Sequence, residues 1–276
     1  MAGSLTVSIG QYSDKGRKPA NQDFYGALIP GQPALDLKGI AIALADGIST
    51  SAVSSIAAQT AIKSVLTDYY ATPDSWQVKT AAQRVIASTN SWLHGQTRAQ
   101  YEIEVESGYV CTLAVLVLKG RTAHVFHVGD SRVARLSGHS LEQLTEDHRV
   151  PAPDGRSYLG RALGIGANVE IDYRTTPLAV GDIFVLTTDG VHEHLGAAAL
   201  ADAITSHAGD LDAAAAAIGA LALQRGSDDN LTVQLVRIDA VPDGDPGDFL
   251  GRAAELPVPP ALAPGAALDG YRIVRQ

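Results

Sequence analysis

The sequence has little cysteine, little positive charge and no long apolar run. Cys111 is the single cysteine among 276 residues, which excludes an internal disulfide and fits a reducing compartment. There are 21 Lys and Arg against 30 Asp and Glu, a net charge of −9, which disfavours broad binding to nucleic acid or anionic membranes. No apolar run approaches the roughly 20 residues of a membrane span, and the N-terminus lacks signal-peptide features. We therefore expect a cytoplasmic protein with neither nucleic acid nor membrane as its partner.

Proline is unevenly distributed, and this predicts the domain organisation. Six of the 13 prolines fall within residues 241–268, with alanine and glycine between them. Such a composition cannot bury a core and is typical of a semi-rigid linker. We therefore expect one domain at residues 1–240, a linker at 241–268, and the start of a further strand at 269–276.

Residues 1–240 alternate between strand-forming and helix-forming stretches. Strands are expected at 5–10, 24–29 and 39–46, followed by helices at 51–70 and from Pro73, in a first helical turn, to about 98. Strand pairs around the stretches KGR, SGHS and TPLAVG predict three hairpins. Helices at 197–207 and 211–224 and a strand at 230–238 complete the pattern. We expect an α+β fold, a central antiparallel β-sandwich flanked by pairs of helices on both faces in four layers, α-β-β-α.

Aspartates recur at the ends of these strands or in the adjoining turns. Carboxylates that converge at one end of two stacked sheets repel one another, and the sequence places no lysine or arginine beside most of them. Hard divalent cations bound through oxygen would compensate, and two such ions can activate water and hold a phosphate. A single such aspartate is ordinary turn or cap chemistry, so the whole set carries the interpretation. The set comprises Asp23, Asp46, Asp130, Asp189, Asp228 and Asp229.

Six short motifs occur in a fixed order along the chain. They are ADG at 45–47, GDSR at 129–132, LTEDHR at 144–149, RALG at 161–164, LTTDGV at 186–191 and DNLTV at 229–233. Together they resemble the motifs of the metal-dependent Ser/Thr protein phosphatases, the PPM or type 2C family. The resemblance covers residues 5–238 and implies a pair of antiparallel sheets with helices on both sides, in agreement with the fold expected above.

The resemblance implies a two-ion catalytic centre. Asp46 would bridge two Mg²⁺ or Mn²⁺ ions, with the backbone carbonyl of Gly47 on one of them. Asp189 and Asp229 would complete the two sites. A hydroxide bridging the ions would attack phosphorus directly, without a phospho-enzyme intermediate.

Further roles follow from the same resemblance. Asp130 would help to hold a third, weaker metal ion together with Asp189, and Ser157 falls where some bacterial members supply another ligand for that ion. Asp23 would orient metal-bound water from outside the ligand set. Asn230 would brace the end of the last strand.

The sequence also departs from the family pattern. An arginine that commonly grips the substrate phosphate is replaced by Lys18, with Arg17 beside it, and lysine lacks the bidentate fork. Gln22 replaces a frequent glutamate. Ile48–Thr50 stand where many members carry glycines or a histidine general acid, so the leaving group would take its proton from water or another residue. The segment Val150–Gly160 is shorter than the flap of many bacterial members, which implies a different substrate selection.

Two other signals are weaker. His192 and His194, in the stretch HEH, suggest zinc only faintly, because a third clear ligand is missing and loop histidines are common. Cys111 lies in an apolar strand and is expected to be a buried small hydrophobe.

The sequence as a whole predicts a Mn²⁺- or Mg²⁺-dependent phosphatase of phosphoserine and phosphothreonine in phosphoproteins. One alternative is a pseudophosphatase that keeps the fold as a regulatory or binding module, and a second is a metal-binding structural protein without catalysis. The final stretch, Leu268–Gln276, resembles the first strand of a protein kinase domain. This resemblance predicts a Ser/Thr kinase in the same polypeptide as a further partner, and the alternative is a disordered C-terminal tail.

Overall fold

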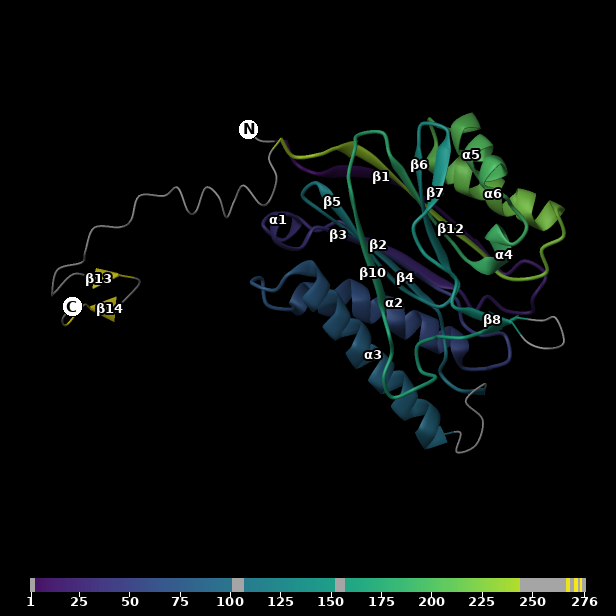
Figure 1. Ribbon diagram of the computed structural model, residues 1–276, viewed down its shortest axis with the longest axis horizontal. Coiled ribbons are helices and arrows are strands. Elements are labelled where there is room, and N and C mark those ends of the chain that lie inside the picture. The colour runs from purple at the N-terminus through teal and green to yellow at the C-terminus, as the bar shows by residue number, and fades with distance from the viewer. Residues whose placement is uncertain are drawn as a thin grey trace. The chain divides into compact units, whose positions relative to one another are not determined.

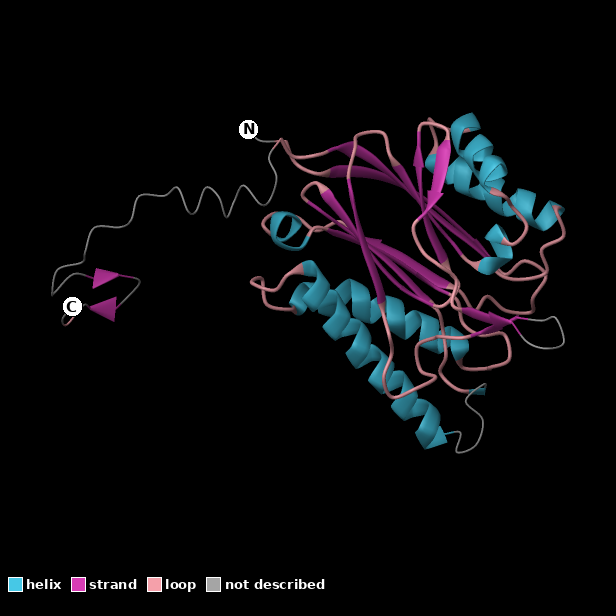
Figure 2. Ribbon diagram, viewed as in Figure 1, coloured by secondary structure: helices cyan, strands magenta, loops and turns pink. Residues whose placement is uncertain are grey.

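The computed structural model describes residues 3–100, 107–151 and 157–243, together with 267–268, 271–272 and 274. Contacts divide the chain into two units, Met1–Asp243 and Gly244–Gln276. The first unit contains two five-stranded antiparallel sheets that stack face to face, with a pair of helices outside each sheet (Figures 1 and 2). This confirms the four-layer α-β-β-α arrangement expected from the sequence.

One sheet packs against the two long helices that connect its strands β3 and β4. Its strand order is β10-β5-β4-β3-β2, with bounds β2 (Phe24–Leu28), β3 (Ile40–Ala45), β4 (Leu113–Lys119), β5 (Thr122–Val128) and β10 (Asp172–Pro177). The covering helices are α2 (Ser54–Ala71) and α3 (Val78–Gln100), and the short α1 (Ala34–Lys38) joins β2 to β3. β4 and β5 form the hairpin predicted around the stretch KGR, with Gly120 in its turn at a positive φ.

The other sheet packs against the second helix pair. Its strand order is β1-β12-β11-β6-β7, with bounds β1 (Thr6–Asp14), β6 (Arg132–Ser137), β7 (Ser140–Gln143), β11 (Ile183–Thr187) and β12 (Leu231–Ala240). The helices on its outer face are α5 (Ala197–Ser206) and α6 (Leu211–Gln224), and the short α4 (Asp189–His192) follows β11. A separate small hairpin joins β8 (Arg149–Pro151) to β9 (Ser157–Leu159).

Strand β3 shows how the sequence specifies the layers. Its isoleucines and leucine point into the core between the sheets, where they meet Phe184 and Leu186. Its three alanines face the other way and pack against α2 at Ala57 and Ala61. Large side chains fill the wide space between sheets and small ones admit the helices, so the strand is apolar on both faces. Each fully buried isoleucine or leucine contributes about 1.5–3 kcal/mol.

The predicted hairpin around TPLAVG is wrong. β10 pairs with β5 in one sheet, whereas β11 pairs with β6 and β12 in the other. The intervening segment crosses between the sheets: the Leu178 amide donates to the Arg121 carbonyl and the Gly181 amide to the Ile238 carbonyl. Leu178 is buried in the core between the sheets, and that burial favours the crossing over a local turn.

The position predicted for Pro73 is also wrong. Residues 73–76 form a turn, and α3 begins at Val78. The buried Lys38 ammonium donates to the carbonyls of Thr72 and Pro73, which fixes this stretch outside the helix. The short elements α1, α4, β8 and β9 were not predicted because none is long enough to show a hydrophobic period.

The Gly244–Gln276 unit contains β13 (Ala267–Leu268) and β14 (Tyr271–Arg272), which pair antiparallel. Most of the predicted linker and of the predicted kinase strand lie outside the described residues, so both stay predictions. Within the described ranges, none of the helices combines the length and the hydropathy that crossing a bilayer requires.

Candidate active site

The predicted aspartates meet at one edge of the sandwich because of strand pairing. β2 pairs antiparallel with β3, so Asp23, just before β2, and Asp46, just after β3, lie at the same edge. β11 pairs antiparallel with β12, which places Asp189 and Asp229 together in the same way. Asp130 follows β5 at this edge as well, and the five carboxylates are near enough to influence one another's charge.

Asp46 is at the electrostatic centre of the group. Burial raises the pKa of Asp46 well above its ordinary value, and the charges of Asp23, Asp189, Asp130 and Asp229 raise it further. Crowded oxygen ligands with excess negative charge form the donor set that hard divalent cations prefer. The residues present therefore fit Mg²⁺ or Mn²⁺.

The turn after β3 leaves no room for a side chain at Gly47. A Cβ there would lie 2.7 Å from the Ser54 backbone and 2.9 Å from the Gln22 carbonyl oxygen. The Asp46 amide donates to Thr112 Oγ1 at 2.9 Å, and the Thr112 amide donates to the Asp46 carbonyl at 2.8 Å. These contacts fix the direction of the Asp46 side chain at the end of its strand.

Asp23 lies beneath the group and is buried. Its Oδ2 accepts hydrogen bonds from Thr188 Oγ1 at 3.0 Å and from Thr232 Oγ1 at 2.6 Å, so it links β2 to the opposite sheet. Its Oδ1 is buried without a hydrogen-bond partner. Burial raises the pKa of Asp23 to about 7, and the charge of Asp189 adds to the rise. An unpartnered buried carboxylate oxygen beside four other carboxylates fits a place behind a hydrated cation.

Asp130 and Asp189 share a cation that sequence reasoning missed. Arg149 Nε lies 3.1 Å from Asp130 Oδ2, Arg149 Nη2 lies 3.9 Å from Asp189 Oδ2, and Arg149 Nη1 pairs with Glu193. Burial raises the pKa of Asp130 to about 6 and Asp189 raises it further, while Arg149 opposes the rise. Most of these aspartates have no basic residue beside them in the sequence, as expected. In the folded protein, however, Arg149 lies next to two of them.

Lys18 pairs with another carboxylate of the group, Asp229. Its Nζ is 3.0 Å from Asp229 Oδ2 and 3.0 Å from Ser49 Oγ, and its side chain is 27% exposed. The remaining oxygen of Asp229, Oδ1, accepts from the Asn230 amide at 2.8 Å. The lysine predicted to bind phosphate therefore lies next to a predicted metal ligand and is open to solvent.

Asn230 fastens the loop that carries Lys18. Its Nδ2 donates to the carbonyls of Lys15 and Ala20, and its Oδ1 accepts from the Gln22 amide at 2.8 Å. The Gln22 side chain, in place of the family's glutamate, donates to Ser54 Oγ at 2.6 Å at the start of α2. One buried amide at the start of β12 thus holds the loop over the carboxylates.

Residues 12–224 match the family model of Protein phosphatase 2C. The chain belongs to the protein phosphatase 2C family. It is therefore a serine/threonine protein phosphatase by family, and its aspartate group lies where the family motifs of the sequence meet in space.

Named relatives agree with this family. The chain is 25% identical over 222 residues to the serine/threonine phosphatase stp of Listeria monocytogenes, covering 74% of this chain and 86% of the relative. It is 26% identical over 151 residues to the protein phosphatase PhpP of Streptococcus pneumoniae, covering 49% of this chain and 61% of the relative.

Solved structures show the same fold. Stp1 of Staphylococcus aureus superposes with a TM-score of 0.76 at 19% identity, covering 87% of this chain and 98% of that one. The phosphatase PstP of Mycobacterium tuberculosis gives a TM-score of 0.71 at 22% identity, covering 86% and 100%. The PstP catalytic domain was also solved in complex with two manganese ions.

Three other candidate residues from the sequence are exposed at the surface of the 2C fold. Arg17 is exposed beside Lys18, and Asp228 is exposed beside Asp229. Ser157 is exposed at the start of β9, paired with Pro151 of β8. The predicted roles of Arg17 and Ser157 stay predictions.

The stretch HEH does not form a zinc site among the described residues. His192 is buried in α4, where its Nδ1 hydrogen bonds with Thr187 Oγ1 at 3.0 Å, and Glu193 pairs with Arg149. The weak zinc signal therefore has a structural explanation. Cys111 is buried, as expected, and burial raises the pKa of its thiol.

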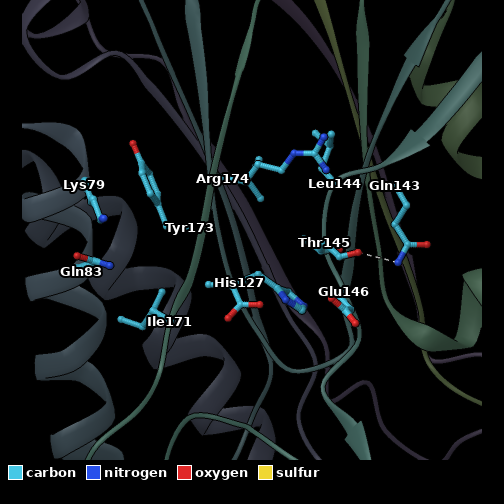
Figure 3. A pocket seen from close by; sticks show the side chains of 12 residues that line it. Lys79, Gln83, His127, Gln143, Leu144, Thr145, Glu146, Ile171, Tyr173 and Arg174 are labelled. Carbon is cyan, nitrogen blue, oxygen red and sulfur yellow. Dashed lines mark hydrogen bonds between the residues drawn. The ribbon is translucent and has the colours of Figure 1, made fainter.

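A cavity of about 690 Å³ lies between α3 and the strands β5 and β10, with the segment after β7 on its other side (Figure 3). His127, His148 and Asp172 cluster beside it. The Gly129 amide donates to His148 Nδ1, so His148 Nε2 carries the proton and donates to Asp172 Oδ2 at 2.9 Å. His148 is therefore satisfied without a metal ion, and it anchors the turn that carries Asp130.

Proposed function

We propose that this 2C-family phosphatase hydrolyses phosphoserine and phosphothreonine in phosphoproteins at a centre of two divalent cations. Asp46 and the carbonyl of Gly47, with Asp189 and Asp229, would hold the pair. Mn²⁺ or Mg²⁺ bound there would supply positive charge for the phosphate and acidity for an attacking water. The observation that carries the proposal is the group of five converging carboxylates, in which the charges of Asp23, Asp130, Asp189 and Asp229 raise the pKa of the fifth, Asp46.

The protein's own residues supply the rest of the chemistry. Lys18, with Arg17 beside it, would exchange its contact with Asp229 for the substrate phosphate. Asp23, with one free carboxylate oxygen, would orient water behind the metal pair. Ile48–Thr50 contain no side chain that titrates near neutral pH, so the leaving alkoxide would take its proton from water.

A direct test measures hydrolysis of p-nitrophenyl phosphate and of a phosphothreonine peptide with Mn²⁺, with Mg²⁺ and with a chelator. We expect turnover that depends on the ion and that leaves no labelled protein after acid quench of a ³²P-labelled substrate. Turnover that persists in chelator would contradict the metal centre. Trapped phospho-enzyme would contradict direct attack.

One observation favours a second candidate, a pseudophosphatase that serves as a binding module. Lys18 and Arg149 already pair with Asp229, Asp130 and Asp189, so internal cations offset part of the charge. In that case the chain would bind phosphopeptide, or Mn²⁺, with no turnover. The same assay, run alongside phosphopeptide binding, separates the two candidates.

We also propose that a Ser/Thr kinase in the same polypeptide is a partner of this phosphatase. Support comes from the resemblance of Leu268–Gln276 to a first kinase strand and from the proline-rich residues before it. Sequencing the source gene beyond the codon for Gln276 tests this. A glycine-rich loop followed by a Val-Ala-x-Lys strand would support it, and a stop codon would refute it.

A further inference from the structure

Arg149 lies on the two carboxylates that a third metal ion would share. Its Nε is 3.1 Å from Asp130 Oδ2 and its Nη2 is 3.9 Å from Asp189 Oδ2, while Nη1 pairs with Glu193. The Nε hydrogen is not aligned with an acceptor, so the Asp130 contact is an ion pair rather than a hydrogen bond. Arg149 therefore acts here through its charge, against three carboxylates at once.

The fold fixes the place from which Arg149 reaches the site. The His148 amide donates to the Gly129 carbonyl at 2.8 Å, and the Gly129 amide donates back to His148 Nδ1 at 3.0 Å. These two hydrogen bonds join the start of β8 to the turn that presents Asp130. The Gly160 amide donates to the His148 carbonyl and closes the base of the β8–β9 hairpin. The residue before Arg149, His148, is thus hydrogen-bonded to the residue before Asp130, Gly129. These contacts hold the guanidinium near the Asp130 carboxylate.

The expected further ligand, Ser157, lies in a less favourable place. Arg149 pairs with Leu159 and Pro151 pairs with Ser157, so Ser157 stands two residues nearer the hairpin tip than Arg149. Two residues along a strand correspond to about 7 Å. Directly paired residues share a face of a hairpin, so Arg149 stands on the same face at the end nearer Asp130.

A divalent cation between Asp130 and Asp189 would have to displace this guanidinium or lie against its positive charge. Oxygen-bound Mg²⁺ sits about 2.1 Å from its ligands, within the space that the Arg149 contact with Asp130 Oδ2 occupies. Arginine keeps its charge at all physiological pH values, so deprotonation cannot relieve the repulsion.

We propose that Arg149 is a built-in cation that takes the place of a third metal ion in this chain. Asp130 then serves to hold Arg149, and the loaded protein carries two ions, on Asp46, Asp189 and Asp229. This inference rests on the proposed two-ion centre. It departs from the expectation that Asp130 and Ser157 hold a third ion.

The test counts bound Mn²⁺ per chain by titration, with the free ion measured by electron paramagnetic resonance. We expect two ions in the wild type and in Arg149→Lys, which keeps the charge. Arg149→Ala should gain a third ion, and adding Asp130→Asn to that variant should remove it. The matched control is Arg237→Ala, because Arg237 is similarly exposed and pairs with Asp239 near the end of β12 that is far from Asp229.

The outcomes separate this inference from the proposed function. Three ions in the wild type, or no gained ion in a folded Arg149→Ala, would overturn the role of Arg149 and leave the two-ion centre standing. A gained ion that survives Asp130→Asn would also overturn it, because the new site would lie elsewhere. A wild type that binds no Mn²⁺ and shows no turnover would overturn the proposed function itself.

Discussion

The two cations at the rim of the active site are held in different ways. Lys18 stands on a loop and touches one carboxylate, Asp229, and one hydroxyl. Arg149 stands at the base of a hairpin and touches Asp130, Asp189 and Glu193. A lysine is a mobile point charge, and it can exchange a single carboxylate for a phosphate at little cost. A planar guanidinium with three anionic neighbours would give up three favourable electrostatic contacts if it moved, so its displacement costs more free energy.

This difference suggests a division of roles. The Lys18 side is suited to capturing the substrate phosphate, whereas the Arg149 side is suited to permanent charge balance. Asp46 is coupled to the partners of both cations, because Asp229, Asp130 and Asp189 all raise its pKa. Substitution of Asp46 should therefore have the largest effect on turnover. Substitution of Lys18 should affect mainly substrate binding, and substitution of Arg149 mainly the number of bound ions.

The largest expected effect comes from removing the charge at the shared centre. Asp46→Asn should lower kcat by roughly a thousandfold, equivalent to about 4 kcal/mol of transition-state stabilisation, because the side chain proposed to bridge the two metal ions would be lost. Steady-state kinetics with Mn²⁺ on p-nitrophenyl phosphate measure this, with circular dichroism to confirm folding. Asp228→Asn, at the exposed neighbour of Asp229, is the control and should retain wild-type turnover. Wild-type kcat in folded Asp46→Asn would refute the assignment.

The next largest effect concerns the stability of the metal-free protein and its dependence on the charge of Asp23. The folded-state pKa of Asp23 is raised to about 7 from 3.8, so the folded state binds more protons than the unfolded state between these values. Stability of the metal-free protein should therefore fall as pH rises from about 4 to 7, by on the order of a few kcal/mol. Added Mn²⁺ should restore it at pH 7.

Urea unfolding in chelator across this pH range measures the effect. Buried histidines act in the opposite direction, since burial lowers the pKa of His127 to about 4 and of His192 to about 3. The informative quantity is thus the difference between the wild type and Asp23→Asn, in which those contributions cancel. Parallel stability curves for the two proteins would show that Asp23 does not titrate in this range.

Loosening the loop on the Lys18 side should cost an intermediate amount. Asn230→Ala removes the partners of the Gln22 amide and of the Lys15 and Ala20 carbonyls, so we expect a loss of about 1–3 kcal/mol in unfolding free energy. Urea denaturation compares it with Asn168→Ala at an exposed position, where little change is expected. Equal stability of the two variants would contradict the bracing role.

The smallest effect should follow from removing the proposed phosphate contact of Lys18. Lys18→Ala should raise KM about tenfold, or 1.4 kcal/mol, with a smaller change in kcat, because a ground-state contact is lost. Lys18→Arg should recover much of the affinity, and Lys15→Ala, at an exposed position of the same loop, should match the wild type. An unchanged KM in Lys18→Ala combined with Arg17→Ala would assign phosphate capture to another group.

The layers of the fold and the choice of the central carboxylates followed from local patterns along the chain. The apolar run at Ile40–Ala45 specifies a strand buried on both faces, and the aspartate directly after it must lie at that strand's end. Helix pairs and most hairpins followed in the same way from local periodicity and turn residues. The ordered motifs then indicated which aspartates belong together.

Tertiary structure alone decided the contacts between elements distant in the chain. The crossing at Leu178 depends on burial between two sheets, and no local pattern encodes the second sheet. The approach of Arg149 to Asp130 depends on hydrogen bonds between His148 and Gly129, 19 residues apart. A basic residue that looks remote in sequence becomes part of the site only when the strands are paired. The charge balance of these side chains depends on their distances in the folded protein, and local periodicity of the sequence carries no information on those distances.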